Sequence, residues 1–387
     1  SGEQVTDKRG IEEADEKFNI INLVCTGAMM KIFPCRNIAG KTLEWYSQSD
    51  QLPQDMDNDK WVFIRKSMSY VNEMIVMKKY NDACLLLEKI KKYQQKECDG
   101  LLPADNKFKA EKIYNQFDYS KSVAMACICI GLICFIYYCH CMASQKRTSR
   151  KAIIILNILL WIVFTYLSAA ICLRGYVSNH LPLSNGFETM QFMAWCTLLL
   201  TFLLQRKFAM LLPFGFLLCG LTLMVSMLGE SNPQITQLMP VLQSPLLSIH
   251  VVVIMIAYSL LAFIMLNGVT AVILHQSQKE CKEQIERLQI ISQIILYPAI
   301  FLLAIGIFIG AVWANVSWGR YWGWDPKEVW ALITMLVYAL ALHPRSLPWF
   351  HRTMFFHVFC ITAFITVLIT YFGVNFLLGG MHSYANG

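Results

Sequence analysis

Long apolar stretches alternate with short polar loops over the last two-thirds of the chain. A helix needs about 20 consecutive apolar residues to cross the hydrocarbon core of a bilayer. Stretches that approach or exceed this length fall at 122–143, 152–173, 187–204, 208–228, 246–274, 288–314, 327–343 and 354–378. The pattern predicts an all-α polytopic membrane protein with about eight transmembrane helices.

The first 120 residues have a different pattern, in which polar and apolar residues are mixed. Apolar residues recur at helical spacing in 60–80 and 81–96, which predicts a small α-rich soluble domain with an α-hairpin at 61–97. We expect three parts: the soluble domain at 1–120, a single transmembrane helix at 121–145, and the main membrane domain at 146–387. The soluble part holds Cys25, Cys35, Cys84 and Cys98, which would pair in an oxidising compartment, with a connectivity that the sequence leaves open.

Composition supports the membrane interpretation and gives an orientation. The chain has 387 residues, of which 56% are hydrophobic and 15% charged. Its net charge of +7 does not indicate a nucleic-acid partner, because the basic residues cluster in short loops between apolar stretches. One set of alternate loops carries eleven lysines and arginines and the other set carries three. The positive-inside rule then places both termini and the soluble domain outside the cytoplasm.

The fourteen cysteines do not indicate a metal or redox centre. Most lie inside apolar stretches, where they would pack as small hydrophobic residues. The sequence has no CxxC or CxxCH motif, which disfavours a zinc ribbon, a thioredoxin-like site and a self-attached c-type haem.

The segment WGRYWGWDPKEVW, residues 318–330, is the most unusual feature of the sequence. It lies in the predicted outer loop between the sixth and seventh apolar stretches. Interfacial tryptophans usually form an aromatic belt, but here glycines and charges are interleaved with the rings. Asp325, Pro326 and Glu328 have the order of a helix start, with Asp325 as N-cap, and this role is favoured over acid–base chemistry.

Histidines flank this segment on the same predicted side of the membrane. His250 lies near the outer start of the fifth stretch and His382 follows the outer end of the eighth. Two neutral imidazoles can hold the two axial positions of a haem iron, and aromatic rings can form flat walls for a porphyrin. Arg320 and Lys327 are candidates to pair with haem propionates. His343 ends the seventh stretch on the opposite side. A lone histidine near a helix end is more often a hydrogen-bonded interface residue, and His180 receives no role.

These residues resemble the tryptophan-rich WWD motif of the cytochrome c assembly proteins that handle haem, which include the CcsA, CcmC and CcmF types. The likeness is greatest to the CcsA type, the membrane half of a cytochrome c synthase. Further segments of the resemblance are SNHLPLSNGFE (178–188), QSPLLSIHVVV (243–253), ALHPR (341–345) and LLGGMHSYA (377–385). Residues 146–387 would form the CcsA-like domain.

The resemblance implies the activity of a holocytochrome c synthase, or haem lyase, in a bacterial cytoplasmic membrane. Haem b would be held at an outward platform with His250 and His382 as iron ligands, and then joined to the CxxCH cysteines of an apocytochrome c. His343 matches a histidine that contributes to haem entry. The other residues expected to bind haem are Trp318, Trp322, Trp324, Asp325 and Trp330. The resemblance also implies a CcsB (ResB-like) membrane partner, fused or separate, that supplies a further histidine.

Three alternatives remain beside the synthase. A haem exporter or chaperone of the CcmC type would present haem without forming thioether bonds. A cytochrome b-like protein would place paired histidines about four turns apart within the spans, which this sequence does not do. An ordinary transporter would show internal repeats or broken helices, and no clear repeat is present.

Overall fold

The computed structural model describes residues 8–36, 42–54, 56–208, 210–228, 232–235, 244–277 and 281–378. The chain forms two compact units, Ser1–Asp105 and Asn106–Gly387. His382 and the last residues of the LLGGMHSYA segment lie outside the described residues.

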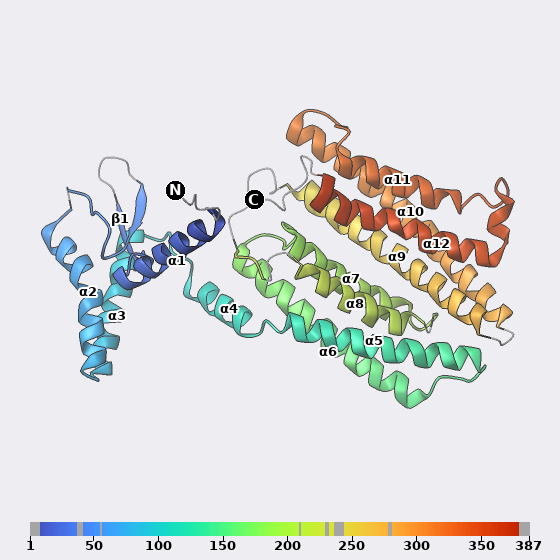
Figure 1. Cartoon of the computed structure of the whole chain (residues 1–387), viewed down its shortest axis with the longest axis horizontal. Coiled ribbons are helices and arrows are strands. Elements are labelled where there is room, and N and C mark those ends of the chain that lie inside the picture. Colours follow the sequence, from blue (N-terminus) through green and yellow to red (C-terminus); the bar gives the residue numbers. More distant parts are fainter. Residues whose placement is uncertain are drawn as a thin grey trace, which may run out of the picture. The chain divides into compact units, whose positions relative to one another are not determined.

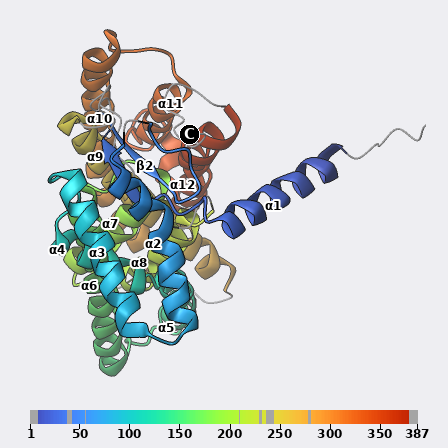
Figure 2. The same cartoon turned by 90° about the vertical axis from the view of Figure 1, so that its left-hand side faces the viewer.

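The first unit combines three helices with a β-hairpin. Its elements are α1 (Lys8–Thr26), β1 (Phe33–Arg36), β2 (Leu43–Tyr46), α2 (Asn58–Val76) and α3 (Tyr80–Cys98). Helices α2 and α3 are the expected α-hairpin, and they enclose a core with Phe33 of β1. The antiparallel hairpin, which pairs Phe33 with Tyr46, was not expected from the sequence. Figure 2 shows α1 projecting from the rest of this unit.

The four cysteines of the first unit are free thiols in the structure. Cys35 and Cys98 are buried, and Cys25 and Cys84 are exposed. Burial raises the pKa of both the Cys35 and the Cys98 thiol, because a thiolate is poorly solvated away from water.

The second unit is a bundle of helices that lie side by side (Figure 1). It contains α4 (Asp105–Gln116), α5 (Ser120–Ala143), α6 (Arg150–Ser178), α7 (Gly186–Leu204), α8 (Leu211–Ser226), α9 (Pro245–Gln276), α10 (Lys282–Trp318), α11 (Pro326–Leu340), the 3-10 turn η2 (Pro348–His351), α12 (Thr353–Leu368) and the π-helix η3 (Ile369–Leu378). A helix lies at each of the eight stretches predicted to be helical. The prediction of an all-α polytopic membrane protein is therefore confirmed.

The eight helices differ in length. Six are long and apolar enough to cross a membrane, and η3 extends the last of these, which runs from Thr353 to Val374. Helix α8 has 16 residues and α11 has 15. At a rise of 1.5 Å per residue, α11 extends roughly 22 Å, which is shorter than the hydrocarbon core of a bilayer.

Two buried clusters hold the bundle together. One joins α5, α6, α7 and α8 with part of α9, and the other joins α9, α10, α11 and α12 with part of α7. Small residues allow the close contacts: a Cβ on Gly220 of α8 would lie 2.8 Å from the backbone nitrogen of Ile128 on α5. Several cysteines pack as the small hydrophobic residues expected from the sequence, and those that are buried in these helices include Cys127, Cys196, Cys219 and Cys360.

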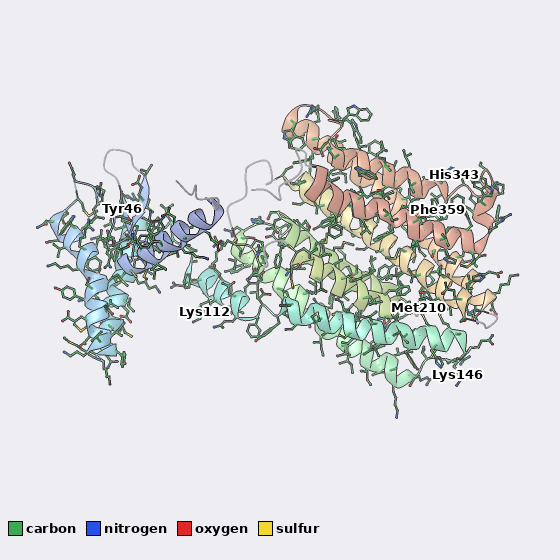
Figure 3. The ribbon with its side chains drawn as sticks, in the orientation of Figure 1. Tyr46, Lys112, Lys146, Met210, His343 and Phe359 are labelled. Atoms are coloured by element: carbon green, nitrogen blue, oxygen red, sulfur yellow. The ribbon has the colours of Figure 1, made fainter. Side chains whose placement is uncertain are left out.

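The two ends of the bundle carry different residues. We call the end where α10 stops and α11 starts the tryptophan end, because residues 318–325 connect the two helices there. His343 lies just beyond the other end of α11, and Figure 3 shows it at the same end of the bundle as Lys146. It is exposed, and its Nδ1 lies 2.9 Å from the carbonyl oxygen of Ala339. The structure therefore places His343 far from the tryptophan segment.

Candidate functional site

A cavity of ≈ 290 Å³ lies at the tryptophan end of the bundle. Its walls come from the start of α7 and the segment before it, from α9 and α10, from the loop between α10 and α11, from the start of α11, and from η3. Most of the surface is apolar. The residues that carry the chemistry of the site are Ser184, His250, Tyr321, Trp322, Lys327 and Tyr371.

His250 enters the cavity from α9 with a defined proton position. Its Nδ1 lies 2.7 Å from the carbonyl oxygen of Gly306 on α10. Because a carbonyl oxygen only accepts hydrogen bonds, Nδ1 must carry the proton, and Nε2 then carries the lone pair that a metal needs. This is the arrangement expected of an imidazole that binds iron through Nε2.

The imidazole packs against α10 at a position that has no side chain, Gly310. A Cβ on Gly310 would lie 2.7 Å from Cε1 and 2.8 Å from Nδ1 of His250. Real Cβ contacts are not that short, so the imidazole can occupy this position only because residue 310 is glycine. The sequence analysis missed Gly310, because a glycine in an apolar helix carries no chemical signal of its own.

A short, fixed loop joins α10 to α11. Helix α10 ends at Gly319 with φ of +72°, and Trp324 has φ of +56°. A capping box then starts α11, as predicted from the sequence. The Glu328 carboxylate accepts hydrogen bonds from the backbone N–H groups of Gly323, at 2.8 Å, and Asp325, at 3.2 Å. Asp325 accepts from the backbone N–H of Lys327 at 3.0 Å, so both acids have structural roles here.

The tryptophans of this loop occupy different environments. Trp322 lines the cavity. Trp324 is 77% exposed and meets Trp322 edge to face, with ring centroids 6.1 Å apart. Trp318 packs edge to face against the buried Trp313, which also lines the cavity. Trp330 and Asp325 are not among the cavity-lining residues.

The two predicted cations also differ in position. Lys327, in the first turn of α11, lines the cavity. Arg320 is exposed, and its guanidinium folds over the loop so that a Cβ on Gly323 would lie 3.2 Å from Nε. Only Lys327 therefore has a position from which it faces the cavity directly.

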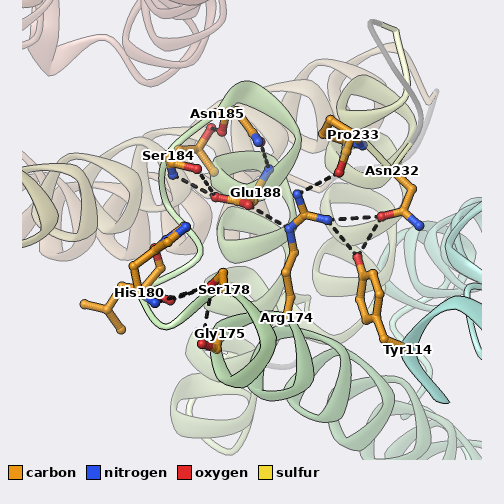
Figure 4. A network of polar contacts seen from close by, with 12 residues as sticks. Tyr114, Arg174, Gly175, Ser178, His180, Ser184, Asn185, Glu188, Asn232 and Pro233 are labelled. Atoms are coloured by element: carbon orange, nitrogen blue, oxygen red, sulfur yellow. Dashed lines mark hydrogen bonds and ion pairs between the residues drawn. The ribbon is translucent and has the colours of Figure 1, made fainter. Parts of the chain in front are cut away.

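Another part of the cavity wall comes from residues to which the sequence analysis assigned no role. Asn185 caps α7, with its side-chain oxygen accepting from the backbone N–H of Glu188 at 2.9 Å. Ser184 and Asn185 line the cavity, while Glu188 lies behind them (Figure 4). His180, in the same loop, does not line the cavity, and its Nδ1 lies 2.9 Å from the carbonyl oxygen of Leu181.

The cavity offers one imidazole and not a cluster of metal ligands. Within the ranges that the structure covers, no group of three histidine, cysteine, aspartate or glutamate side chains could hold a bare metal ion. One imidazole, aromatic rings, a lysine and the Glu328 carboxylate line a mostly apolar cavity. A porphyrin fits this donor set, because it supplies four of the iron ligands itself and needs only axial ones from the protein.

Comparison with known proteins gives a consistent family. A model of the family described as cytochrome C assembly protein matches residues 183–382. Protein NrfI of Wolinella succinogenes is 31% identical over 379 residues, which are 97% of this chain and 42% of NrfI. The chain thus spans less than half the length of that relative.

Two shorter relatives are covered over most of their length. The cytochrome c biogenesis protein CcsA of Chlamydomonas reinhardtii is 35% identical over 253 residues, 62% of this chain and 71% of the relative. The CcsA protein of Prochlorococcus marinus strain MIT 9301 is 31% identical over 276 residues, 62% of this chain and 87% of the relative. The chain therefore belongs to the cytochrome c assembly protein family, and within it to the CcsA type.

Proposed function

We propose that this protein binds haem in the cavity at the tryptophan end and promotes its covalent attachment to apocytochrome c. The observation that carries the proposal is the geometry of His250, whose Nδ1 proton is directed to Gly306 while the ring rests on Gly310. With the proton on Nδ1, the Nε2 lone pair is the one that would bind iron, in a cavity that Trp322 and Lys327 also line. The names of the CcsA relatives support a role in cytochrome c biogenesis.

The second axial ligand in this proposal is His382. In the sequence it lies four residues after the end of η3. Tyr371 of η3 lines the cavity. Bis-histidine ligation would give low-spin iron and would keep haem at the platform until the histidine of a CxxCH segment replaces one of the two ligands.

The protein's chemical contribution is chiefly orientation. Thioether formation adds the S–H of a cysteine across a haem vinyl group, with no net oxidation or reduction. The chain has to hold the porphyrin plane, with Trp322 as a wall and Lys327 as a partner for a propionate, so that the vinyl groups meet the incoming thiols. Such positioning reduces the entropic part of the barrier without a strong acid or base.

The remaining parts of the proposal concern entry, partners and place. His343, at the opposite end of α11, would take part in haem entry together with a histidine from a CcsB (ResB-like) partner. The uneven distribution of basic residues supports an orientation with the tryptophan end and both termini outside, and the resemblance implies a bacterial cytoplasmic membrane as the location. The first unit would then also lie outside, where apocytochrome c arrives.

The absorption spectrum of the purified, haem-loaded protein tests the site. We expect low-spin haem in the wild type, high-spin or absent haem in His250→Ala and His382→Ala, and recovery of the low-spin spectrum on addition of imidazole. His180→Ala is the matched control, because His180 lies at the same end of the bundle and outside the cavity. The proposed ligands would be refuted if the spectrum were the same as wild type in both His250→Ala and His382→Ala, or if it changed equally in His180→Ala.

A second experiment separates a synthase from an exporter or chaperone. The chain is produced with a CcsB-type partner and a CxxCH apocytochrome in a host that lacks its own assembly system. Haem that remains attached to the cytochrome after denaturation supports the synthase. Bound haem on the membrane protein without covalent transfer would support the exporter or chaperone instead.

A further inference from the structure

A buried ion pair lies directly behind one wall of the cavity. Arg174, near the end of α6, and Glu188, in the first turn of α7, are 1% and 3% exposed. The Nε of Arg174 donates to Oε1 of Glu188 at 2.7 Å. In the sequence, Arg174 is only a basic residue near the end of an apolar stretch, and nothing there indicates that it is buried.

The guanidinium of Arg174 also joins segments that are far apart in the chain (Figure 4). Its Nη1 donates to the Tyr114 hydroxyl of α4 at 3.2 Å and to the side-chain oxygen of Asn232 at 3.1 Å. Its Nη2 donates to the backbone carbonyl of Pro233 at 3.0 Å. The planar guanidinium thus fixes α4, the 232–235 segment and α7 relative to α6.

The other oxygen of Glu188 reaches the cavity wall. Oε2 accepts a hydrogen bond from the backbone N–H of Ser184 at 2.8 Å and from its hydroxyl at 2.6 Å. Ser184 lines the cavity, as His250 and Trp322 do. One carboxylate therefore connects the Arg174 network on one side with the cavity wall on the other.

Stability alone is a poor explanation for such a pair. Removing two charges from water is costly, and apolar residues of similar volume often replace a buried ion pair without loss of stability. What an apolar pair could not provide is the directed contact with Ser184, because that contact needs an acceptor at a fixed position. The pair therefore has a geometric role in the placement of residues 183–186.

We propose that Arg174 and Glu188 are positioning residues of the haem site, which set the 183–186 wall at the distance from His250 that bound haem requires. This inference rests on the proposed function, since it takes haem as the occupant of the cavity. It assigns no chemistry to either side chain. Both act through Ser184.

The test replaces the pair by apolar residues, so that no unpaired charge remains buried. In Arg174→Met/Glu188→Leu, we expect amide hydrogen exchange of residues 183–189 in haem-free protein and the rate of haem release each to rise about tenfold, a change equivalent to 1.4 kcal/mol. The control is Asn267→Leu/Ser292→Ala, which removes an equally buried polar contact of 3.2 Å between α9 and α10, away from the cavity. We expect that control to leave both rates within about twofold of wild type, as for distant, independent sites.

A milder substitution covers the case in which the double variant does not fold. Tyr114→Phe removes one acceptor of Arg174 and the hydrogen bond that the Tyr114 hydroxyl donates to Asn232 at 3.0 Å. It leaves the Arg174–Asn232 hydrogen bond and the ion pair in place. The loss of the two Tyr114 hydrogen bonds predicts that exchange at 183–189 and haem release rise at least about threefold. Unchanged exchange and release in this variant would overturn the inference.

The two readouts separate this inference from the function on which it rests. A loosened wall with haem release equal to that of the wild type overturns the positioning role and leaves the proposed function intact. Equal effects in the Asn267/Ser292 control also overturn it, because the effect would then be general destabilisation. A wild-type protein that binds no haem overturns the proposed function, and the positioning role with it.

Discussion

Gly310→Ala adds one methyl group where the imidazole of His250, the candidate iron ligand, packs against α10. In the interior of an α-helix this substitution normally stabilises a protein by roughly 0.5–1 kcal/mol, because alanine loses less backbone entropy on folding. Here the new methyl would lie 2.7 Å from Cε1 and 2.8 Å from Nδ1 of His250. The imidazole must move away, and its 2.7 Å hydrogen bond to Gly306 must lengthen or break.

The size of the effect follows from two costs and one gain. Overpacking by a methyl group costs roughly 1–3 kcal/mol, and loss of one hydrogen bond costs roughly 0.5–1.5 kcal/mol. The gain in helix propensity offsets part of this sum. A net loss of roughly 1–3 kcal/mol in the orientation that binds iron weakens haem binding roughly 5- to 150-fold.

Haem titration followed by visible absorption measures this loss, and thermal unfolding of the haem-free protein measures stability separately. We expect a Gly310→Ala protein that is folded, binds haem weakly in a high-spin form, and becomes low-spin when imidazole is added. Gly175→Ala on α6 is the matched control, since its Cβ would meet its nearest neighbours at 3.4 Å. If the Gly310→Ala protein binds haem with wild-type affinity and spectrum, the role of Gly310 in orienting His250 for iron binding is refuted.

Three further predictions concern the loop and the first unit. The Trp324→Gly variant is expected to be more stable than the Trp324→Ala variant by roughly 1 kcal/mol in thermal unfolding. The reason is the backbone φ of +56° at this exposed position, which glycine adopts without strain and alanine does not. The reverse order of stability would contradict backbone strain at position 324. Glu328→Ala removes the acceptor of two backbone N–H groups. It should lower the free energy of unfolding by roughly 1 kcal/mol and speed amide hydrogen exchange in the loop between α10 and α11. Unchanged exchange would argue against the capping box. Burial raises the pKa of the Cys35 and Cys98 thiols, so iodoacetamide at pH 8 should modify them more slowly than the exposed Cys25. Mass spectrometry measures the three rates, and equal rates would contradict the burial of Cys35 and Cys98.

The features that the sequence predicts well depend on local composition. Helical stretches are recognised from continuous hydrophobicity, since backbone groups in lipid must pair within the segment. The start of α11 follows from the order of Asp325, Pro326 and Glu328, because a capping box involves neighbours only. The common placement of His250 and the tryptophan segment at one end of the bundle follows from counting alternate helices.

The features that it predicts poorly depend on contacts between distant segments. Nothing near Arg174 or Glu188 in the sequence shows that they share a buried network with Tyr114 and Asn232. Gly310 becomes meaningful only when α9 and α10 are placed side by side. The β-hairpin was missed for a different reason: its strands have four residues each, which is too short for an alternating pattern to be distinguished.

The short length of α11 has a consequence for the bilayer around the protein. A 15-residue helix is roughly 8 Å shorter than a hydrocarbon core of about 30 Å, so a bilayer that α11 spans would thin locally beside it. The tryptophan loop and His343, which bracket α11, then lie closer together than the two surfaces of an undisturbed membrane. The barrier that separates the two ends of the bundle would be thinnest beside this helix.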